Sequence, residues 1–227
     1  MMYRNLEEVI DDRMFPRADL DLRRGRHIGS DYDPSLFDFL TSSRNFLEGF
    51  YARFNAALLQ GQEGYFYLLP DRLAVPPPLG LRRLSVIEML SGQTLALMRL
   101  DPKWLATNQR IPERAVFEFM EQILGEGRLL RLAQRRRGKD TGQDARKLRL
   151  AFSSALHALG QLGFIRREGR GEQAVVVPLK AIMRFADPVR SAEDVDHALK
   201  RLIAEGELGD EDEDAGTDPV AEEEELS

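Results

Sequence analysis

Two stretches of this chain follow the same plan, in which helices are followed by a short strand pair and then by a proline. In the first stretch, apolar residues recur with a 3.6-residue period over residues 36–54, and a strand pair around a glycine-bearing turn follows at 57–69. In the second, a strand pair at 164–177 follows the last of three helices. Pro70 and Pro178 end the two pairs, because proline has no N–H for a strand ladder. We therefore expect a mostly α structure with small β-hairpins, of the α+β class.

The repeated plan predicts tandem winged-helix domains, because helices with a hairpin packed on them are the winged-helix arrangement. Residues 71–83, with three prolines at their centre, indicate a stiff linker and the best domain boundary. We expect an N-terminal winged-helix domain over residues 1–80, a C-terminal one over 81–190, and a terminal helix with an acidic disordered tail over 191–227. A generic α+β domain with two incidental hairpins is the alternative that periodicity leaves open.

Local signals place several helix ends. The Asp-Pro pair at 33–34 combines an N-cap with a first-turn proline, and the segment Ser-Val-Ile-Glu at 85–88 has the spacing of a capping box. A break at Pro16 separates two short helices near the N-terminus. A polar, basic stretch at 128–147 precedes the third helix of the second domain, which we expect over 148–162.

Charge is unevenly distributed along the chain. The formal net charge is −6, yet residues 206–227 hold eleven acidic residues and no Lys or Arg, which leaves 32 basic and 27 acidic residues over positions 1–205. A mildly basic body with an acidic tail suggests proximity to nucleic acid, although solvated acidic ends are common in other proteins. The tail has few apolar residues, so we expect it to be disordered.

Several protein classes are disfavoured by composition. No run approaches the roughly 20 consecutive apolar residues of a membrane span, and the first residues carry acidic groups where a signal peptide needs an apolar run. There is no cysteine, which excludes disulfides and thiolate chemistry. We expect a cytoplasmic protein.

No catalytic or metal-binding motif is visible in the sequence. The histidines His27, His157 and His197 lie far apart and lack metal-ligand spacing, and there is no nucleophile elbow, phosphate-binding loop or dinucleotide fingerprint. The aspartate pairs at 11–12 and 31/33 suit helix ends and turns at least as well as acid–base chemistry. We therefore expect a binding protein without a cofactor rather than an enzyme, and only a site built from scattered residues stays open.

The segment RRGRHIG at 23–29 is the densest cationic feature of the N-terminal half. It can contact an anion or an acidic partner peptide. Alternatively, its arginines bond the carbonyl groups at a helix C-terminus, as arginines near helix ends commonly do.

A second basic cluster precedes and enters the third helix of the second domain and continues onto the following hairpin. In a winged helix, this helix and wing present charge to a DNA duplex, and phosphate contacts give affinity without sequence information. Aromatic residues for base stacking are missing there, which disfavours single strands. We predict weak, non-specific contact with double-stranded DNA; a solvated flexible loop is the alternative. The candidate DNA-binding residues are Arg135, Arg136, Arg137, Lys139, Arg146, Lys147, Arg149, Arg166, Arg167 and Arg170.

Several stretches resemble the MukE family. The most specific are RRGRHIG at 23–29, FYARFNAALL at 50–59 and EGYFYLLP at 63–70, and a looser likeness covers MRFADPVR at 183–190. These stretches follow one another in family order over roughly residues 15–205, so the resemblance is global.

The resemblance implies a tandem winged-helix, non-enzymatic accessory subunit of the bacterial MukBEF condensin. Such subunits bind the kleisin subunit (MukF-like), form homodimers, and help regulate the SMC ATPase (MukB-like) in chromosome condensation, organisation and partition during the cell cycle and cell division. They are cytoplasmic and nucleoid-associated. On this resemblance, the residues expected to contact a partner are Arg23, Arg24, Arg26 and His27 of the cationic loop and Tyr65, Phe66 and Tyr67 of the apolar hairpin.

A stand-alone winged-helix transcriptional regulator is the alternative function. Such a regulator reads base edges with Asn, Gln or Arg side chains along its recognition helix. The helix expected at 148–162 offers mainly Ser153, Ser154 and Gln161, which is a poor set for that task. An enzyme comes third, for lack of a motif.

Overall fold

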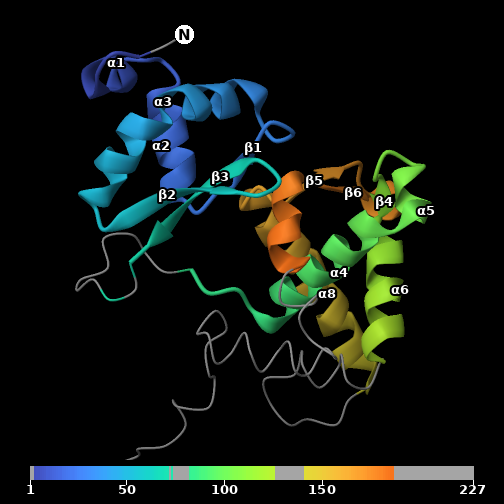
Figure 1. The fold of residues 1–227 in the computed structure, drawn as a ribbon. Helices are drawn as coiled ribbons and strands as arrows, with labels where there is room; N and C mark the ends of the chain where they lie inside the picture. The colour runs from blue at the N-terminus through green and yellow to red at the C-terminus, as the bar shows by residue number, and fades with distance from the viewer. Residues whose placement is uncertain (1–2, 72, 74–81, 126–140, 187–227) are drawn as a thin grey trace, which may run out of the picture.

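The computed structural model describes residues 3–71, 73, 82–125 and 141–186 and is mostly helical with two small antiparallel sheets (Figure 1). The first group of elements is α1 (Leu6–Ile10), α2 (Phe15–Arg23), β1 (Ile28–Gly29), α3 (Pro34–Ala52), β2 (Ala56–Gly61) and β3 (Tyr65–Pro70). The second group is α4 (Val86–Leu100), α5 (Pro102–Leu105), β4 (Ile111–Pro112), α6 (Glu113–Leu124), α8 (Thr141–Gln161), β5 (Ile165–Glu168), β6 (Val175–Pro178) and the 3-10 helices η1 (Gly171–Gln173) and η2 (Lys180–Phe185). The expected α+β class with small hairpins is confirmed.

Both expected hairpins are present, and each carries a third strand that the sequence did not reveal. β2 pairs with β3, and β1 adds to the other side of β3 by placing Ile28 opposite Phe66. β5 pairs with β6, and β4 adds to β6 by placing Ile111 opposite Val176. Strands of two residues are too short for an alternating pattern to be visible, which is why they were missed.

The local helix signals were mostly right. The carboxylate of Asp33 accepts a hydrogen bond from the Leu36 N–H at 3.1 Å, as expected of an N-cap. Ser85 and Glu88 form the reciprocal capping box at the start of α4.

Two expected helix boundaries were wrong. The break between the first two helices falls at residues 11–14, and Pro16 lies in the first turn of α2, where its missing N–H has no intrahelical partner to lose. α8 begins at Thr141, ahead of the expected start at 148, because polar residues extend a helix without adding to its apolar stripe. The linker prolines and the segment 187–227, including the expected terminal helix and tail, lie outside the described residues.

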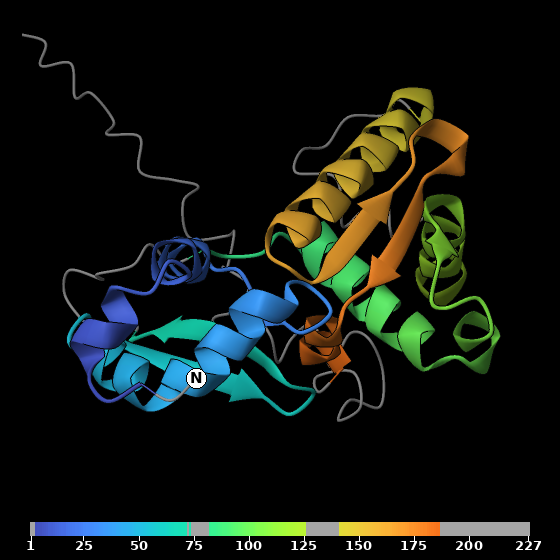
Figure 2. The ribbon, with the colours of Figure 1, turned by 90° about the horizontal axis from the view of Figure 1, so that it is seen from above.

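Two hydrophobic cores occupy the described chain. One lies between the helices α1 to α3 and the first sheet, and it is formed by Val9, Leu22, Leu36, Leu40, Leu47, Phe66 and neighbours. The other lies among α4, α6, α8 and the second sheet, and it is formed by Leu95, Met120, Leu156, Val176, Ile182 and neighbours. Tyr65 of β3 belongs to the second core, so the first sheet packs against the second group of elements (Figure 2).

The two groups of elements meet where the loop before β1 lies against the C-terminus of α8. The His27 N–H donates to the Leu162 carbonyl at 2.8 Å. The next residue, Gly163, has a φ of +77°, and a Cβ placed there would lie 2.3 Å from the carbonyl oxygen of His27. Glycine at position 163 therefore allows both the left-handed backbone conformation and the close approach of the α8 end to the backbone of His27.

We expect Gly163→Ala to lower the free energy of unfolding by about 2 kcal/mol or more, since it adds left-handed strain of about 1–2 kcal/mol to a backbone clash. Gly171→Ala is the matched control, because Gly171 also has a positive φ of +59° but nothing within 4 Å of an added Cβ. Urea titrations of both variants measure the difference. Equal losses in the two variants would show that the close approach to His27 contributes nothing.

Candidate functional site

The structure brings the two predicted partner-binding segments together. The ring of His27, from the cationic loop, stacks on Tyr67 of the apolar hairpin with centroids 5.2 Å apart and lies 5.7 Å from Tyr65. A third aromatic neighbour of His27 is Phe164 of the second group of elements, and the centroids of the two rings are 4.2 Å apart. His27 is 5% exposed, so this aromatic cluster is the packed centre of the joint between the two groups.

Hydrogen bonds fix the tautomer of His27. Nε2 lies 2.7 Å from Nη1 of Arg184, and a guanidinium can only donate, so Nε2 accepts. The proton is therefore on Nδ1, which donates to the Leu162 carbonyl at 3.2 Å. The same Arg184 guanidinium lies 4.3 Å from the Tyr67 ring centroid, in a cation–π arrangement.

Burial sets the charge state of this histidine. Desolvation, followed by the positive charge of Arg184, lowers the pKa of His27 from 6.5 to about 3. The imidazole is consequently neutral at physiological pH, and its neutral form is the one that can accept from Arg184.

Arg26 ties the same loop to the end of α8. Its Nε donates to the carbonyl of Gln161 at 2.8 Å, and its Nη1 lies 2.6 Å from the carboxylate of Asp21. A cation at a helix C-terminus is favourable because the carbonyl groups there lack intrahelical donors. Of the two sequence interpretations of the loop, arginine bonding to helix carbonyls is what the structure shows for Arg26, although the helix is 135 residues away.

The remaining predicted partner residues differ in their exposure. Arg23 is held by both carboxylate oxygens of Asp19 and lies over the Phe54 ring, and Phe66 is fully buried in the first core. Arg24 is exposed. The structure thus gives most of these side chains an internal role, and partner contact through them stays a prediction.

Three residues of the joint were missed as site residues. Arg184 belongs to a stretch that carries the family resemblance, which was the available signal. Asp31 accepts from the Lys180 N–H at 2.6 Å, and Lys180 Nζ donates to Ser30 at 2.9 Å. Since Asp31 and Lys180 lie 149 residues apart, no sequence pattern joins them.

The predicted DNA-binding residues divide into three sets. Arg146, Lys147 and Arg149 are exposed near the start of α8, with the guanidinium of Arg149 over the Phe117 ring at 5.8 Å. The β5–β6 hairpin, with the remaining arginines, lies beside this helix (Figure 2). The set Arg135, Arg136, Arg137 and Lys139 lies outside the described residues.

The arginines of the hairpin are partly neutralised by carboxylates. Arg167 pairs with Glu113 at 2.6 Å, and Arg166 shares Glu168 with Arg110. Such half-exposed pairs are weak, so a phosphate can compete for these arginines. Arg170 is exposed at the turn.

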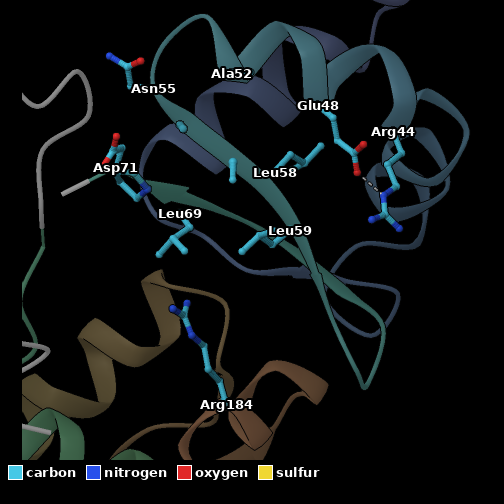
Figure 3. Close-up of a pocket in the computed structure, with 12 residues that line it drawn as sticks. Arg44, Glu48, Ala52, Asn55, Leu58, Leu59, Leu69, Asp71 and Arg184 are labelled. Carbon is cyan, nitrogen blue, oxygen red and sulfur yellow. Dashed lines mark hydrogen bonds and ion pairs between the residues drawn. The ribbon is translucent and has the colours of Figure 1, made fainter. Parts of the chain in front are cut away.

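A groove of about 870 Å³ lies beside β2 (Figure 3). One wall carries Arg44 and Glu48 of α3, which form an ion pair at 2.6 Å. Arg184, from the second group of elements, points toward the strands from the opposite wall (Figure 3). The groove therefore adjoins the aromatic joint through a shared arginine.

The part of the chain that the structure describes holds neither a candidate metal site nor a candidate membrane span. Within the described ranges 3–71, 82–125 and 141–186, no group of three or more His, Asp or Glu side chains could hold a metal ion. None of the helices in that part of the chain combines the length and the apolar character needed to cross a bilayer.

Comparison with known proteins gives a consistent result. The sequence model of the MukE-like family matches residues 2–227. The chain is 33% identical over 220 residues to the chromosome partition protein MukE of Mannheimia succiniciproducens, covering 93% of this chain and 89% of that protein. It is 32% identical over 229 residues to the protein of the same name from Shigella flexneri, covering 96% and 98%.

We expect the joint to make stability depend on pH. The pKa of His27 is about 3 in the folded chain and about 6.5 when unfolded, so below pH 6.5 the unfolded state binds the extra proton. The contribution of His27 is thus fully present above pH 6.5 and falls by about 2 kcal/mol between pH 7 and pH 5. Urea titrations at several pH values measure this loss.

His27→Asn should reduce the pH dependence, because asparagine keeps an N–H donor for the Leu162 carbonyl but does not titrate. His157→Asn is the control, since it makes the same substitution at an exposed position of α8, outside the joint. Identical slopes in the native chain and in His27→Asn would contradict the assignment.

Proposed function

Because the chain belongs to the MukE-like family, we propose that it is a non-enzymatic accessory subunit of a MukBEF-type bacterial condensin that serves chromosome condensation and partition. The observation that carries the proposal is the family match over residues 2–227, supported by relatives named as chromosome partition proteins. The chain also covers 98% of one relative, so the likeness is not confined to a single shared module.

The direct partner in this proposal is the kleisin subunit (MukF-like), through which the chain reaches the SMC ATPase (MukB-like). The joint around His27 supports a binding role, because it holds the two groups of elements in one arrangement. A fixed arrangement lowers the conformational entropy that is lost when a partner binds. We propose that the chain acts as a homodimer at the nucleoid, with each copy presenting this surface.

The order of elements supports the proposal that each group is a winged-helix domain. In both, the hairpin follows the helices and a short strand from between the helices completes a three-stranded antiparallel sheet, so the β5–β6 hairpin corresponds to the wing of the second group. The corresponding domains would be residues 1–80 and 81–190. The exposed Ser153 and Ser154 on α8 read bases poorly, so this geometry favours an assembly role over an operator-binding regulator.

Non-specific contact with duplex DNA is the second part of the proposal. Arg146 and Arg149 are three residues apart on α8 and therefore project from neighbouring positions of one helix face. Both are exposed and can neutralise phosphates without reading the sequence.

Co-expression with the kleisin encoded by the same genome tests the partner assignment. We expect the two chains to co-purify, and light scattering after gel filtration to give the mass of a complex with two copies of this chain. A chain that stays monomeric and elutes apart from the kleisin at micromolar concentration would contradict the proposal.

Fluorescence anisotropy with a duplex of random sequence tests the DNA contact. We expect binding that weakens with salt, and the double variant Arg146→Gln/Arg149→Gln should reduce the slope of log K against log salt by about 2, since each lost phosphate contact removes about 0.9. The control is Arg13→Gln/Arg53→Gln, which removes two exposed arginines of the first group. Equal slopes for both double variants would argue against α8 as the contact.

A further inference from the structure

The two sheets protect their outer hairpin strands differently. β5 reads Ile-Arg-Arg-Glu, and charged residues on an edge strand oppose pairing with another chain. β2 reads Ala-Ala-Leu-Leu-Gln-Gly and has neither charge nor proline. It is also an edge strand, since the order of the described sheet is β1-β3-β2. Among the residues that the structure describes, β2 is therefore an unprotected edge strand.

The register shows which backbone groups of β2 face outward. The Asp71 N–H donates to the Asn55 carbonyl at 2.8 Å, so this pair directs its hydrogen bonds into the hairpin. In an antiparallel ladder, residue pairs that hydrogen-bond to each other alternate with pairs whose N–H and C=O groups point away from the partner strand. The next pair, Ala56 and Pro70, is of the second kind, which agrees with the missing N–H of proline. The N–H and C=O groups of Ala56, Leu58 and Gln60 then point to the free edge.

The groove runs along residues 55–59 of this edge, and aliphatic side chains form its floor between charged walls. It is lined by Asn55 to Leu59 of the β2 side and by Leu69 of β3, with α3 on one flank and Arg184 on the other (Figure 3). Leu59 is half-buried and Leu69 is 39% exposed, so both can contact a ligand. An added strand of six residues would be about 20 Å long, which matches the length of β2.

We propose that β2 receives an extended, largely apolar segment of the kleisin as a fourth strand of the first sheet. This inference rests on the proposed function and names the surface used. Main-chain hydrogen bonds to Ala56, Leu58 and Gln60 supply the register, and side chains of the segment that alternate toward the groove contact Leu59 and Leu69.

Charge and shape favour a kleisin segment at the β2 edge over the acidic tail of this chain and over a second copy of this chain. The groove walls carry two guanidinium groups, Arg44 and Arg184, and two carboxylates, Glu48 and Asp71, so the acidic tail of this chain has no net attraction to them. A second copy would bring its own flanking helix and arginine against the same walls. A contact between two copies that is limited to a six-residue edge would also bury far less than the roughly 800 Å² per partner of a stable interface.

A pair of variants at one position tests the proposal. Gln60→Pro removes an outward N–H and sterically blocks the edge while leaving the ladder to β3 intact, because Gln60 is exposed and its N–H faces away from β3. Gln60→Ala is the control, since it removes only the side-chain contact with Arg44. With full-length kleisin as the probe, we expect Gln60→Ala to bind like the native chain and Gln60→Pro to bind at least tenfold more weakly.

Hydrogen exchange on the native chain gives an independent readout that does not depend on the variant folding. In the free chain, the amides of Ala56, Leu58 and Gln60 should exchange quickly, and about three amides of β2 should gain protection in the kleisin complex. Protection of these amides already in the free chain would mean that another segment or a second copy occupies the edge, and it would overturn the proposal.

The remaining outcomes separate this inference from the proposed function. If the native chain binds kleisin but Gln60→Pro binds equally well, or β2 gains no protection, the edge is not the contact and the kleisin assignment still stands. If the native chain binds no kleisin, the proposed function fails and this inference fails with it.

Discussion

The C-terminal end of α8 depends on hydrogen-bond donors from the other half of the chain. The Gln161 carbonyl accepts from Arg26, and the Leu162 carbonyl accepts from both the backbone N–H and the ring N–H of His27. The Leu162 carbonyl is buried, and a buried carbonyl without a donor costs about 1–3 kcal/mol. The buried aromatic cluster and the position of Arg184 beside β2 belong to the same contact between the two halves. Gly163 makes it possible by leaving room for the carbonyl of His27.

The features of this fold that are local or periodic in the sequence were predictable from it. The long helix α3, the two hairpins and the capping signals at Asp33 and Ser85 are encoded in residues close together, and each was predicted. The short strands β1 and β4 and the pairing of Asp31 with Lys180 depend on partners far along the chain, so no window of sequence contains them. The cationic loop was singled out correctly as unusual. Its role in the joint could not be read from the loop alone, because the helix that Arg26 caps is distant in sequence.

The two surfaces proposed for binding differ in charge, and each suits a different kind of partner. Charged side chains line the β5 edge and the exposed positions 146, 147 and 149 of α8, where a polyanion can be held without sequence preference. The β2 strand carries no charged residue, and its outward backbone groups suit the extended peptide that we propose it binds. The two surfaces belong to different cores, so each can be occupied without displacing the other.

Arg184 belongs to both the joint and the groove, and this shared membership has a thermodynamic consequence. Its guanidinium donates to His27, stacks on Tyr67 and lines the wall opposite α3. A ligand that draws the guanidinium toward the groove weakens its bond to the imidazole and removes a nearby positive charge, which changes the proton affinity of His27. Linkage is reciprocal, so protonation of His27 must alter the affinity of the groove for that ligand by the same free energy. One arginine thereby couples what the chain binds to how its two halves are held together.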